Sequence, residues 1–279
     1  MSEVDKFVAR VFLVVVTASG CDGPAHPPAQ IPPVPITLPD GFAAEIYTAG
    51  LQFPTSVAFP PDGSNRLFVN ELQAGRVRIV QNGALLAQPF ATVETNTTGA
   101  FPVAGENGLL GIAFDPDYSV NRYVYVTYAT RTATGTFGTV ARFTDVNNRG
   151  QDFTVLLDGI PSAPGHQIES LAFGPDGALY VSTGDAYMDG DVQNTGSFVG
   201  KILRLNPDGS LPADNPFPGS YTYAYGFRNC FDLVFDVAGD LYSTDNGPDR
   251  DDEWTSPSTR SRASAIRSTW RKARTAACF

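Results

Sequence analysis

The sequence predicts an all-β protein, a β-propeller of four-stranded blades, and three observations support this fold class. A strand-turn-strand unit recurs along the chain, in residues 56–71, 111–128, 165–185 and 232–247. One equivalent residue recurs at intervals of about 55 to 62 residues, as Ala58, Ala113, Ala172 and Val234. No amphipathic helical pattern lies between residues 38 and 254. A sandwich does not repeat its strands at so long a period, so a propeller explains the pattern better.

Each unit contains two predicted strands in the same order. An alternating apolar strand comes first, a turn with Pro-Asp or Gly follows, and a strand rich in β-branched or aromatic residues completes the unit. Residues 75–80 and 200–205 alternate as well and predict further strands. We therefore expect about three and a half to four blades, in a propeller domain that spans residues 40–254.

The first residues resemble a bacterial lipoprotein signal. Lys6 and Arg10 precede the apolar run 11–16, and small residues lead to Cys21. This apolar run is too short to span a bilayer of about 30 Å as a helix. We predict a signal segment at 1–21, a lipid anchor on Cys21, a Pro-rich linker at 22–39, and a periplasmic or cell-surface location.

The last residues, 255–279, do not continue the strand pattern. They are rich in Ser, Arg and Ala and contain no Asp or Glu. Two interpretations are open, namely sequence from a shifted reading frame and a basic binding tail. We expect this tail to be disordered and to lie outside the propeller.

The charge balance excludes one class of partner. The chain has a formal net charge of −10, and all of its acids lie at or before Glu253. The predicted propeller is therefore strongly acidic and is not expected to bind nucleic acid.

Candidate catalytic residues cluster at the ends of predicted strands. His166 and Asp185 bracket one strand-turn-strand unit, and a histidine with a carboxylate is the usual composition of a general base and its orienting group. Arg228 and Asn229 follow an aromatic strand, where a guanidinium needs an anion, a carbonyl or a planar ligand. Structural roles, a satisfied core histidine and a salt bridge between blades, are the alternatives.

An acidic loop, residues 245–253, offers carboxylate and carbonyl oxygens to a hard cation such as calcium. A solvated turn is the alternative. The loop lacks the alternation of an EF-hand, and the three scattered cysteines form neither a disulfide framework nor a zinc pattern.

Five motifs in order resemble the soluble quinoprotein sugar dehydrogenases, the glucose/sorbosone dehydrogenase family. They are GENGLLGIAFDPDY, GHQIESLAFGPDGALYVSTGD, GKILRLNPDGSLPADNPF, YAYGFRN and DNGPDRDDE, and the resemblance runs from about Leu38 to Glu253. It implies a six-bladed propeller that binds pyrroloquinoline quinone (PQQ) and calcium and oxidises the anomeric hydroxyl of aldose sugars to lactones. The resemblance does not identify the electron acceptor.

The resemblance also implies catalytic roles for three residues. His166 resembles the base that takes the hydroxyl proton while hydride passes to the quinone, and Asp185 resembles its orienting carboxylate. Arg228 resembles the cation that stabilises negative charge on the quinone oxygen.

The remaining matches concern ligands. Asn229 and Asn246 match cofactor-binding positions, Gly247 and Pro248 match the positions whose carbonyls hold calcium, and Glu106 and Gln167 match substrate positions. The chain departs from the family pattern at Glu106, where Gln is frequent, at Asn246, where His or Gln is frequent, and at Cys230, where Pro is common.

Further cofactor-binding Lys and Arg residues of the family, which come from later blades, have no match in this sequence. We therefore expect little or no turnover from this incomplete propeller, and we expect it to expose strand edges. Two other functions stay open at this stage. One is a non-catalytic propeller that binds sugar or protein, and the other is a metal-dependent lactonase-like propeller.

Overall fold

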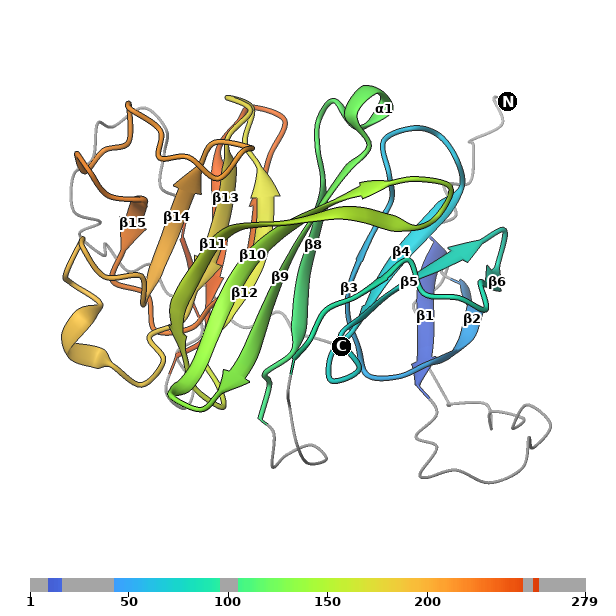
Figure 1. Ribbon diagram of the computed structural model, residues 1–279, viewed down its shortest axis with the longest axis horizontal. Coiled ribbons are helices and arrows are strands. Elements are labelled where there is room, and N and C mark those ends of the chain that lie inside the picture. Colours follow the sequence, from blue (N-terminus) through green and yellow to red (C-terminus); the bar gives the residue numbers. More distant parts are fainter. Residues whose placement is uncertain (1–9, 17–42, 96–104, 248–252, 256–279) are drawn as a thin grey trace, which may run out of the picture.

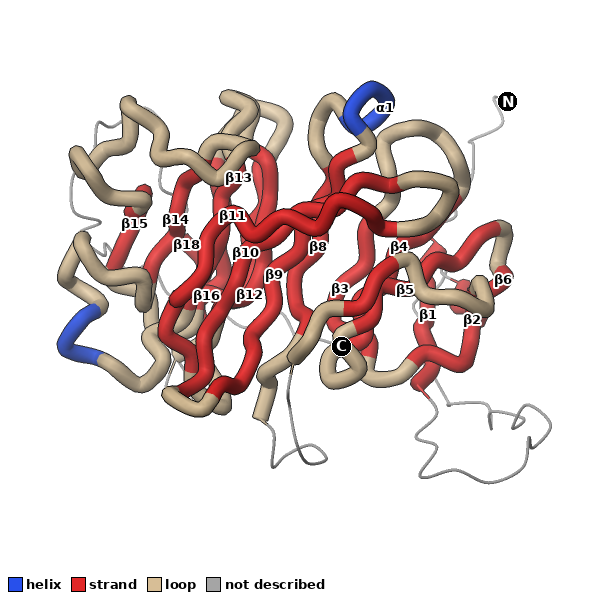
Figure 2. The backbone as a smooth tube through the Cα atoms, viewed as in Figure 1, coloured by secondary structure: helices blue, strands red, loops and turns tan. Residues whose placement is uncertain are grey.

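A computed structural model describes residues 10–16, 43–95, 105–247 and 253–255 of the 279-residue chain. These residues are arranged almost entirely as antiparallel sheets that stand side by side, with very little helix (Figures 1 and 2). No helix among the residues described is long and apolar enough to cross a membrane. The all-β prediction is confirmed.

Four sheets form consecutive blades, each built from one stretch of chain. Blade 1 contains β3 (Pro54–Ala58), β4 (Arg66–Glu71) and β5 (Arg76–Gln81), with β6 (Ala84–Leu85) and β7 (Ala91–Thr92) both paired to β5. Blade 2 contains β8 (Leu109–Phe114), β9 (Tyr123–Thr132), β10 (Gly135–Asp145) and β11 (Gly150–Ser162), with the short helix α1 (Tyr118–Asn121) after β8.

Blade 3 contains β12 (Ile168–Phe173), β13 (Leu179–Thr183), β14 (Lys201–Leu205) and β15 (Thr222–Tyr225), with the 3-10 turn η1 (Asp189–Asp191) after β13. Blade 4 contains β16 (Cys230–Phe235), β17 (Leu241–Asp245) and β18 (Glu253–Thr255). Each of the four recurring sequence units therefore forms the first two strands of a blade, as predicted.

The turn between these two strands is formed by the same side-chain chemistry in all four blades, and in blade 2 Asp115 Oδ1 accepts the Asp117 N–H at 2.9 Å. Asp62 Oδ1 accepts the Ser64 N–H at 3.0 Å, Asp176 Oδ1 accepts the Ala178 N–H at 3.1 Å, and Asp236 Oδ1 accepts the Ala238 N–H at 2.9 Å. An aspartate that caps its own turn explains why the unit reads as strand, turn and strand.

The first strand of each blade, the inner strand, lies beside the inner strands of its neighbours. β8 packs against both β3 and β12, and β12 packs against β16. Every inner strand has a register shift near its start, between Pro54 and Val57, Leu109 and Ile112, Ile168 and Leu171, and Cys230 and Asp232. The chain therefore changes direction at the same end of every blade.

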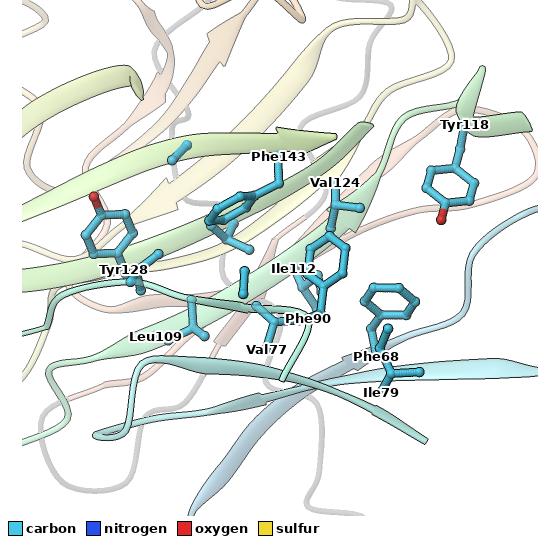
Figure 3. Close-up of a cluster of buried hydrophobic side chains, with 14 residues drawn as sticks. Phe68, Val77, Ile79, Phe90, Leu109, Ile112, Tyr118, Val124, Tyr128 and Phe143 are labelled. Carbon is cyan, nitrogen blue, oxygen red and sulfur yellow. The ribbon is translucent and has the colours of Figure 1, made fainter. Parts of the chain in front are cut away.

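Apolar side chains fill the spaces between blades. Blades 1 and 2 enclose a cluster that contains Phe68, Phe90 and Phe143, whose rings meet edge to face (Figure 3). Val57 on β3 is 51% exposed, whereas its counterparts Ile112 on β8 and Leu171 on β12 are buried between blades. Blades 2 and 3 are thus packed on both faces.

The predicted N-terminal signal lies partly within the described chain. Its apolar run forms β1 (Arg10–Val16), which pairs in parallel with β2 (Ala43–Leu51). Cys21 and the linker 22–39 lie outside the described residues, as does the tail beyond Thr255. The signal, the anchor and the disordered tail stay predictions.

Candidate functional site

The predicted catalytic residues gather at the end of the blades where the inner strands begin, which is the lower end in Figure 1. His166 lies two residues before β12, and Asp185 lies two residues after β13. Because β12 and β13 are antiparallel neighbours, these two positions meet at one end of blade 3. We call this end of blades 2, 3 and 4 the rim.

His166 and Asp185 are in direct contact. Nδ1 of His166 lies 2.7 Å from Oδ1 of Asp185, and both residues are buried. A carboxylate there accepts the Nδ1–H, which leaves Nε2 of the imidazole as a proton acceptor. The pair has the geometry of a general base and its orienting group.

A glycine makes this contact possible. A Cβ on Gly184 would lie 2.5 to 2.6 Å from the carbonyl carbon, Cα and carbonyl oxygen of His166. The Gly184 N–H donates to the Gln167 carbonyl at 2.7 Å. The backbone just after β13 therefore approaches the histidine more closely than any other residue type at position 184 would permit.

Blade 4 joins this pair through its backbone. The Asp185 N–H donates to the Arg228 carbonyl at 2.7 Å, and Gly184 forms an antiparallel bridge with Asn229. Asp245 in turn accepts the N–H groups of Asn229 at 2.6 Å and Arg228 at 3.1 Å. Burial raises the pKa of Asp245, and these two hydrogen bonds oppose that shift.

The Arg228 guanidinium points toward the loop after β17. Its Nη1 donates to the carbonyl oxygens of Asn246 at 2.8 Å and Gly247 at 3.3 Å. The two residues predicted to bind cofactor and calcium are thus next to the arginine predicted to face the quinone. Pro248 lies outside the described residues.

The part of the acidic loop that is described does not form a carboxylate cage. Asp245 uses its oxygens for the backbone N–H groups of blade 4. In the described ranges, no group of three or more His, Cys, Asp or Glu side chains is placed to hold a metal ion. Carbonyl oxygens such as that of Gly247 are the hard donors that this segment offers.

Glu106 and Gln167 lie at the same rim. The Glu106 N–H donates to the Pro164 carbonyl at 2.7 Å, and Gln167 Nε2 donates to the Glu106 carbonyl at 3.1 Å. The backbone of Glu106 is therefore fixed beside the segment that leads to His166, while its side chain is exposed. The structure brings together all of the predicted site residues that it describes.

Two buried amide oxygens at the rim are not used within the described structure. Gln167 Oε1 and Asn229 Oδ1 are both buried without a hydrogen-bond partner among the residues described. A buried polar atom left without a partner is unfavourable by about 1 to 3 kcal/mol. Such atoms fit a site whose remaining contacts come from a ligand.

Glu169, which the sequence did not single out, is a buried carboxyl group of β12. Its Oε1 accepts a hydrogen bond from Gln167 Nε2 at 3.0 Å. Burial raises the pKa of Glu169 well above its usual value, and repulsion from Glu106 and Asp232 adds to the shift. The carboxyl group behind the rim is therefore held toward its neutral form.

Lys201, a second residue that the sequence did not single out, holds the loop between β13 and β14. Its Nζ donates to the carbonyl oxygens of Asp191 at 3.3 Å, Val192 at 2.9 Å and Val199 at 2.5 Å. Burial lowers the pKa of Lys201 to about 8, although Asp191 acts in the opposite direction. This loop carries Tyr187, whose ring lies 4.6 Å from that of His166.

Cys230, which departs from the family pattern, faces the interior. Its thiol lies 2.8 Å from the Ser243 hydroxyl, and burial raises its pKa. The thiolate form is therefore disfavoured, and the residue has a packing role.

Two surface hollows lie at the other end of the blades. They are lined by the turns between β3 and β4 and between β12 and β13, and neither includes a residue of the rim. The rim is recognised by its polar contacts.

A sequence-family model described as Glucose / Sorbosone dehydrogenase matches residues 51–259 of this chain. The match covers all four blades. It ends five residues beyond the predicted propeller boundary at residue 254.

Individual relatives agree with this match. The quinoprotein glucose dehydrogenase B of Acinetobacter calcoaceticus is 30% identical over 77% of this chain and 50% of its own length. The PQQ-bound aldose sugar dehydrogenase of Streptomyces coelicolor superimposes with a TM-score of 0.65 at 31% identity, over 74% of this chain and 60% of that structure. The mouse hedgehog-interacting protein is 30% identical over 60% of this chain and 27% of its own length. This chain thus spans roughly half the length of the sugar dehydrogenases that it matches.

Proposed function

The chain belongs to the glucose/sorbosone dehydrogenase family, and we propose that it is a PQQ-dependent oxidoreductase that converts aldose sugars to lactones at the anomeric carbon. One observation carries this proposal, the buried contact of 2.7 Å between His166 Nδ1 and Asp185 Oδ1 at the rim. A base beside a site for a redox cofactor is what the oxidation of a hydroxyl group requires.

The proposed role of His166 follows from its hydrogen bond. Asp185 fixes the imidazole with Nδ1 protonated, so Nε2 accepts the proton of the anomeric hydroxyl. The same carboxylate stabilises the imidazolium that forms as the proton arrives. Asp185 is itself held by the backbone link to Arg228.

PQQ, when bound, would accept the hydride from the sugar. Three residues would hold it, namely Arg228 through its cation and Asn229 and Asn246 through polar groups. The buried oxygen of Asn229, which has no partner among the residues described, and the partly buried guanidinium of Arg228 fit an anionic planar cofactor. The carbonyl oxygens of Gly247 and Pro248 are of the kind that calcium prefers.

The proposed location is outside the cytoplasm, by lipid attachment at Cys21. This residue lies outside the described chain, and the proposal depends on the sequence before it. An aldose substrate and an extracytoplasmic quinoprotein are compatible with the acidic propeller.

The enzymatic proposal is tested by dye reduction with D-glucose, PQQ and calcium, in a version of the chain extended by the later blades of the family. We expect His166→Ala to lower the rate by about 10² to 10⁴, the usual contribution of a positioned base. His26→Ala replaces the only other histidine and serves as the matched control, with an unchanged rate. An equal rate in His166→Ala and His26→Ala would contradict the proposal.

A non-catalytic sugar- or protein-binding propeller is the second candidate, because the hedgehog-interacting protein is among the relatives. Calorimetric titration with PQQ and calcium separates the two functions. Saturable PQQ binding that Arg228→Ala weakens favours the enzyme, and ligand binding without any PQQ binding favours the alternative. For the metal-dependent lactonase, the described ranges contain no group of three or more His, Cys, Asp or Glu side chains placed to hold a metal ion.

A further inference from the structure

Tyr187 occupies an unusual position beside the proposed base. Its ring centroid lies 4.6 Å from that of His166 with the two planes tilted by 54°, and the tyrosine is 61% exposed. A tyrosine that stabilised the fold by packing would bury most of its 150 to 250 Å². This ring instead presents a face to solvent next to the imidazole.

The backbone that presents the ring is strained. Ala186 and Tyr187 have φ values of 49° and 59°, and His166 has a φ of 58°. The left-handed region is unfavourable for residues with a side chain, by roughly 1 to 2 kcal/mol each. Strain of this kind persists where surrounding contacts enforce it, and such residues cluster at ligand sites.

One carboxylate oxygen enforces both ring positions. Asp185 Oδ1 lies 2.7 Å from His166 Nδ1 and accepts the Tyr187 N–H at 2.9 Å. The Ala186 N–H donates to the His166 carbonyl at 3.0 Å, and the Met188 N–H donates to the Asp185 carbonyl at 2.7 Å. The histidine and the tyrosine are therefore positioned as a unit.

Polar atoms converge beside the exposed ring. A Cβ built on Gly165 would lie 2.8 Å from the Tyr187 hydroxyl and 3.6 Å from Glu106 Oε2. A hydroxyl and a carboxylate thus face the same small space next to His166. Both are suited to the hydroxyl groups of a ligand.

We propose that Tyr187 is the surface on which the pyranose ring of the substrate rests, with the Tyr187 hydroxyl and the Glu106 carboxylate binding hydroxyls at the ring edge. A pyranose has apolar C–H groups on its faces and hydroxyls around its edge, so an aromatic face beside polar acceptors is complementary to it. Stacking of the pyranose on the Tyr187 ring brings a hydroxyl of the sugar toward His166. The choice of ligand rests on the sugar-oxidising function proposed above.

The ring shape of the ligand matters in this arrangement. A cyclic aldose offers a continuous C–H face to the tyrosine, whereas an open-chain polyol does not. Tyr187 therefore selects aldopyranoses over polyols such as sorbitol.

Saturation-transfer NMR with D-glucose tests the contact on the full 279-residue chain without PQQ, so that no oxidation occurs. We expect Tyr187→Gly to weaken glucose binding about 5- to 10-fold, as loss of an aromatic contact implies. Tyr187→Phe, which keeps the ring face, is expected to remain within about threefold of the unsubstituted chain. Sorbitol should give no signal.

Thermal unfolding of the same variants separates a ligand-binding role from a structural one. Glycine tolerates a positive φ, so Tyr187→Gly is expected to melt about 2 °C higher while binding glucose more weakly. Met188→Ala removes the next exposed side chain of the same loop and serves as the matched control, with unchanged glucose binding.

Three outcomes would overturn the inference. They are unchanged glucose binding in Tyr187→Gly, a lower melting temperature for that variant, and no glucose binding by the unsubstituted chain. The PQQ titration is an independent measurement. If PQQ does not bind but glucose binding depends on Tyr187, the enzymatic function fails while the sugar contact stands.

Discussion

Blades 1 and 3 both bury a glutamate, but they surround it in opposite ways. In blade 1, Glu71 accepts hydrogen bonds from Arg76 Nε at 2.7 Å and from Arg78 Nη1 at 3.4 Å. In blade 3, Glu169 accepts one from the neutral amide of Gln167, and no cation of the described chain forms an ion pair with it. The first carboxylate is neutralised locally and the second is not.

The difference extends to the other buried polar groups of these regions. Arg66, at the far end of blade 1, donates to the carboxylates of Asp62 at 2.9 Å and Asp145 at 2.6 Å. The rim of blade 3 instead gathers the neutral amide of Gln167 and three non-glycine residues at positive φ, namely His166, Ala186 and Tyr187, around the proposed base. Blade 1 pairs its buried charges, partly with a carboxylate of the next blade, whereas the buried carboxyl group of blade 3 has no ion pair among the residues described.

The largest predicted effect breaks the charge pairing of blade 1. Arg66→Met leaves Asp145 buried without its guanidinium, so we expect the free energy of unfolding to fall by about 3 to 5 kcal/mol. Arg122→Met is the matched control, because Arg122 pairs with the same Asp62 from a side chain that is 43% exposed, and its effect should stay within about 1 kcal/mol. Urea denaturation measures both, and equal losses would contradict the contrast.

A second change addresses the close approach at the rim. Gly184→Ala forces a Cβ against the His166 backbone, and overpacking of this kind is unfavourable by about 1 to 3 kcal/mol. Because it displaces the base, we expect the glucose-dependent rate to fall as well. Gly190→Ala, in the same loop with open space around it, should change neither quantity. Denaturation and dye reduction are the measurements, and a stable, active Gly184→Ala variant would contradict the prediction.

The smallest effect concerns the two glutamates. The pKa of Glu169 is raised in the folded state, so the folded chain binds more protons than the unfolded chain and loses stability as pH rises above 4.5. Glu169→Gln keeps an acceptor for Gln167 and removes that loss. We therefore expect the variant to be more stable than the unsubstituted chain at pH 7, with a difference that vanishes in acid.

Glu71→Gln completes this comparison. It removes a charge that two arginines neutralise, so it should destabilise the protein at pH 7. Urea denaturation across pH 4 to 8 checks both variants. If both substitutions changed the free energy of unfolding at pH 7 in the same direction, the two blades would not differ in the way described.

Much of the fold and part of the site could be predicted from the sequence. The repeated unit located the first two strands of every blade, and the turn aspartates Asp62, Asp176 and Asp236 explain why the pattern was readable. His166 and Asp185 were predictable as a pair because each lies at the edge of the same antiparallel hairpin.

The rest depends on contacts that sequence patterns do not encode. The approach of Tyr187 to His166 requires a positive φ at two residues, Ala186 and Tyr187, which rarely adopt it. Burial of Glu169 depends on the packing of neighbouring blades. Asp245 was interpreted as part of a cation-binding loop, yet its carboxylate accepts the backbone N–H groups of Arg228 and Asn229, just before the preceding strand β16.

The register shift at the start of every inner strand has a consequence for how such sites arise. All four described blades have it, although only one places a histidine there. The change in backbone direction is therefore a property of the repeat, maintained for folding, and the chemistry is added by side chains at one copy. Evolution could relocate or erase a catalytic centre in such a propeller by a few substitutions, without altering the architecture that displays it.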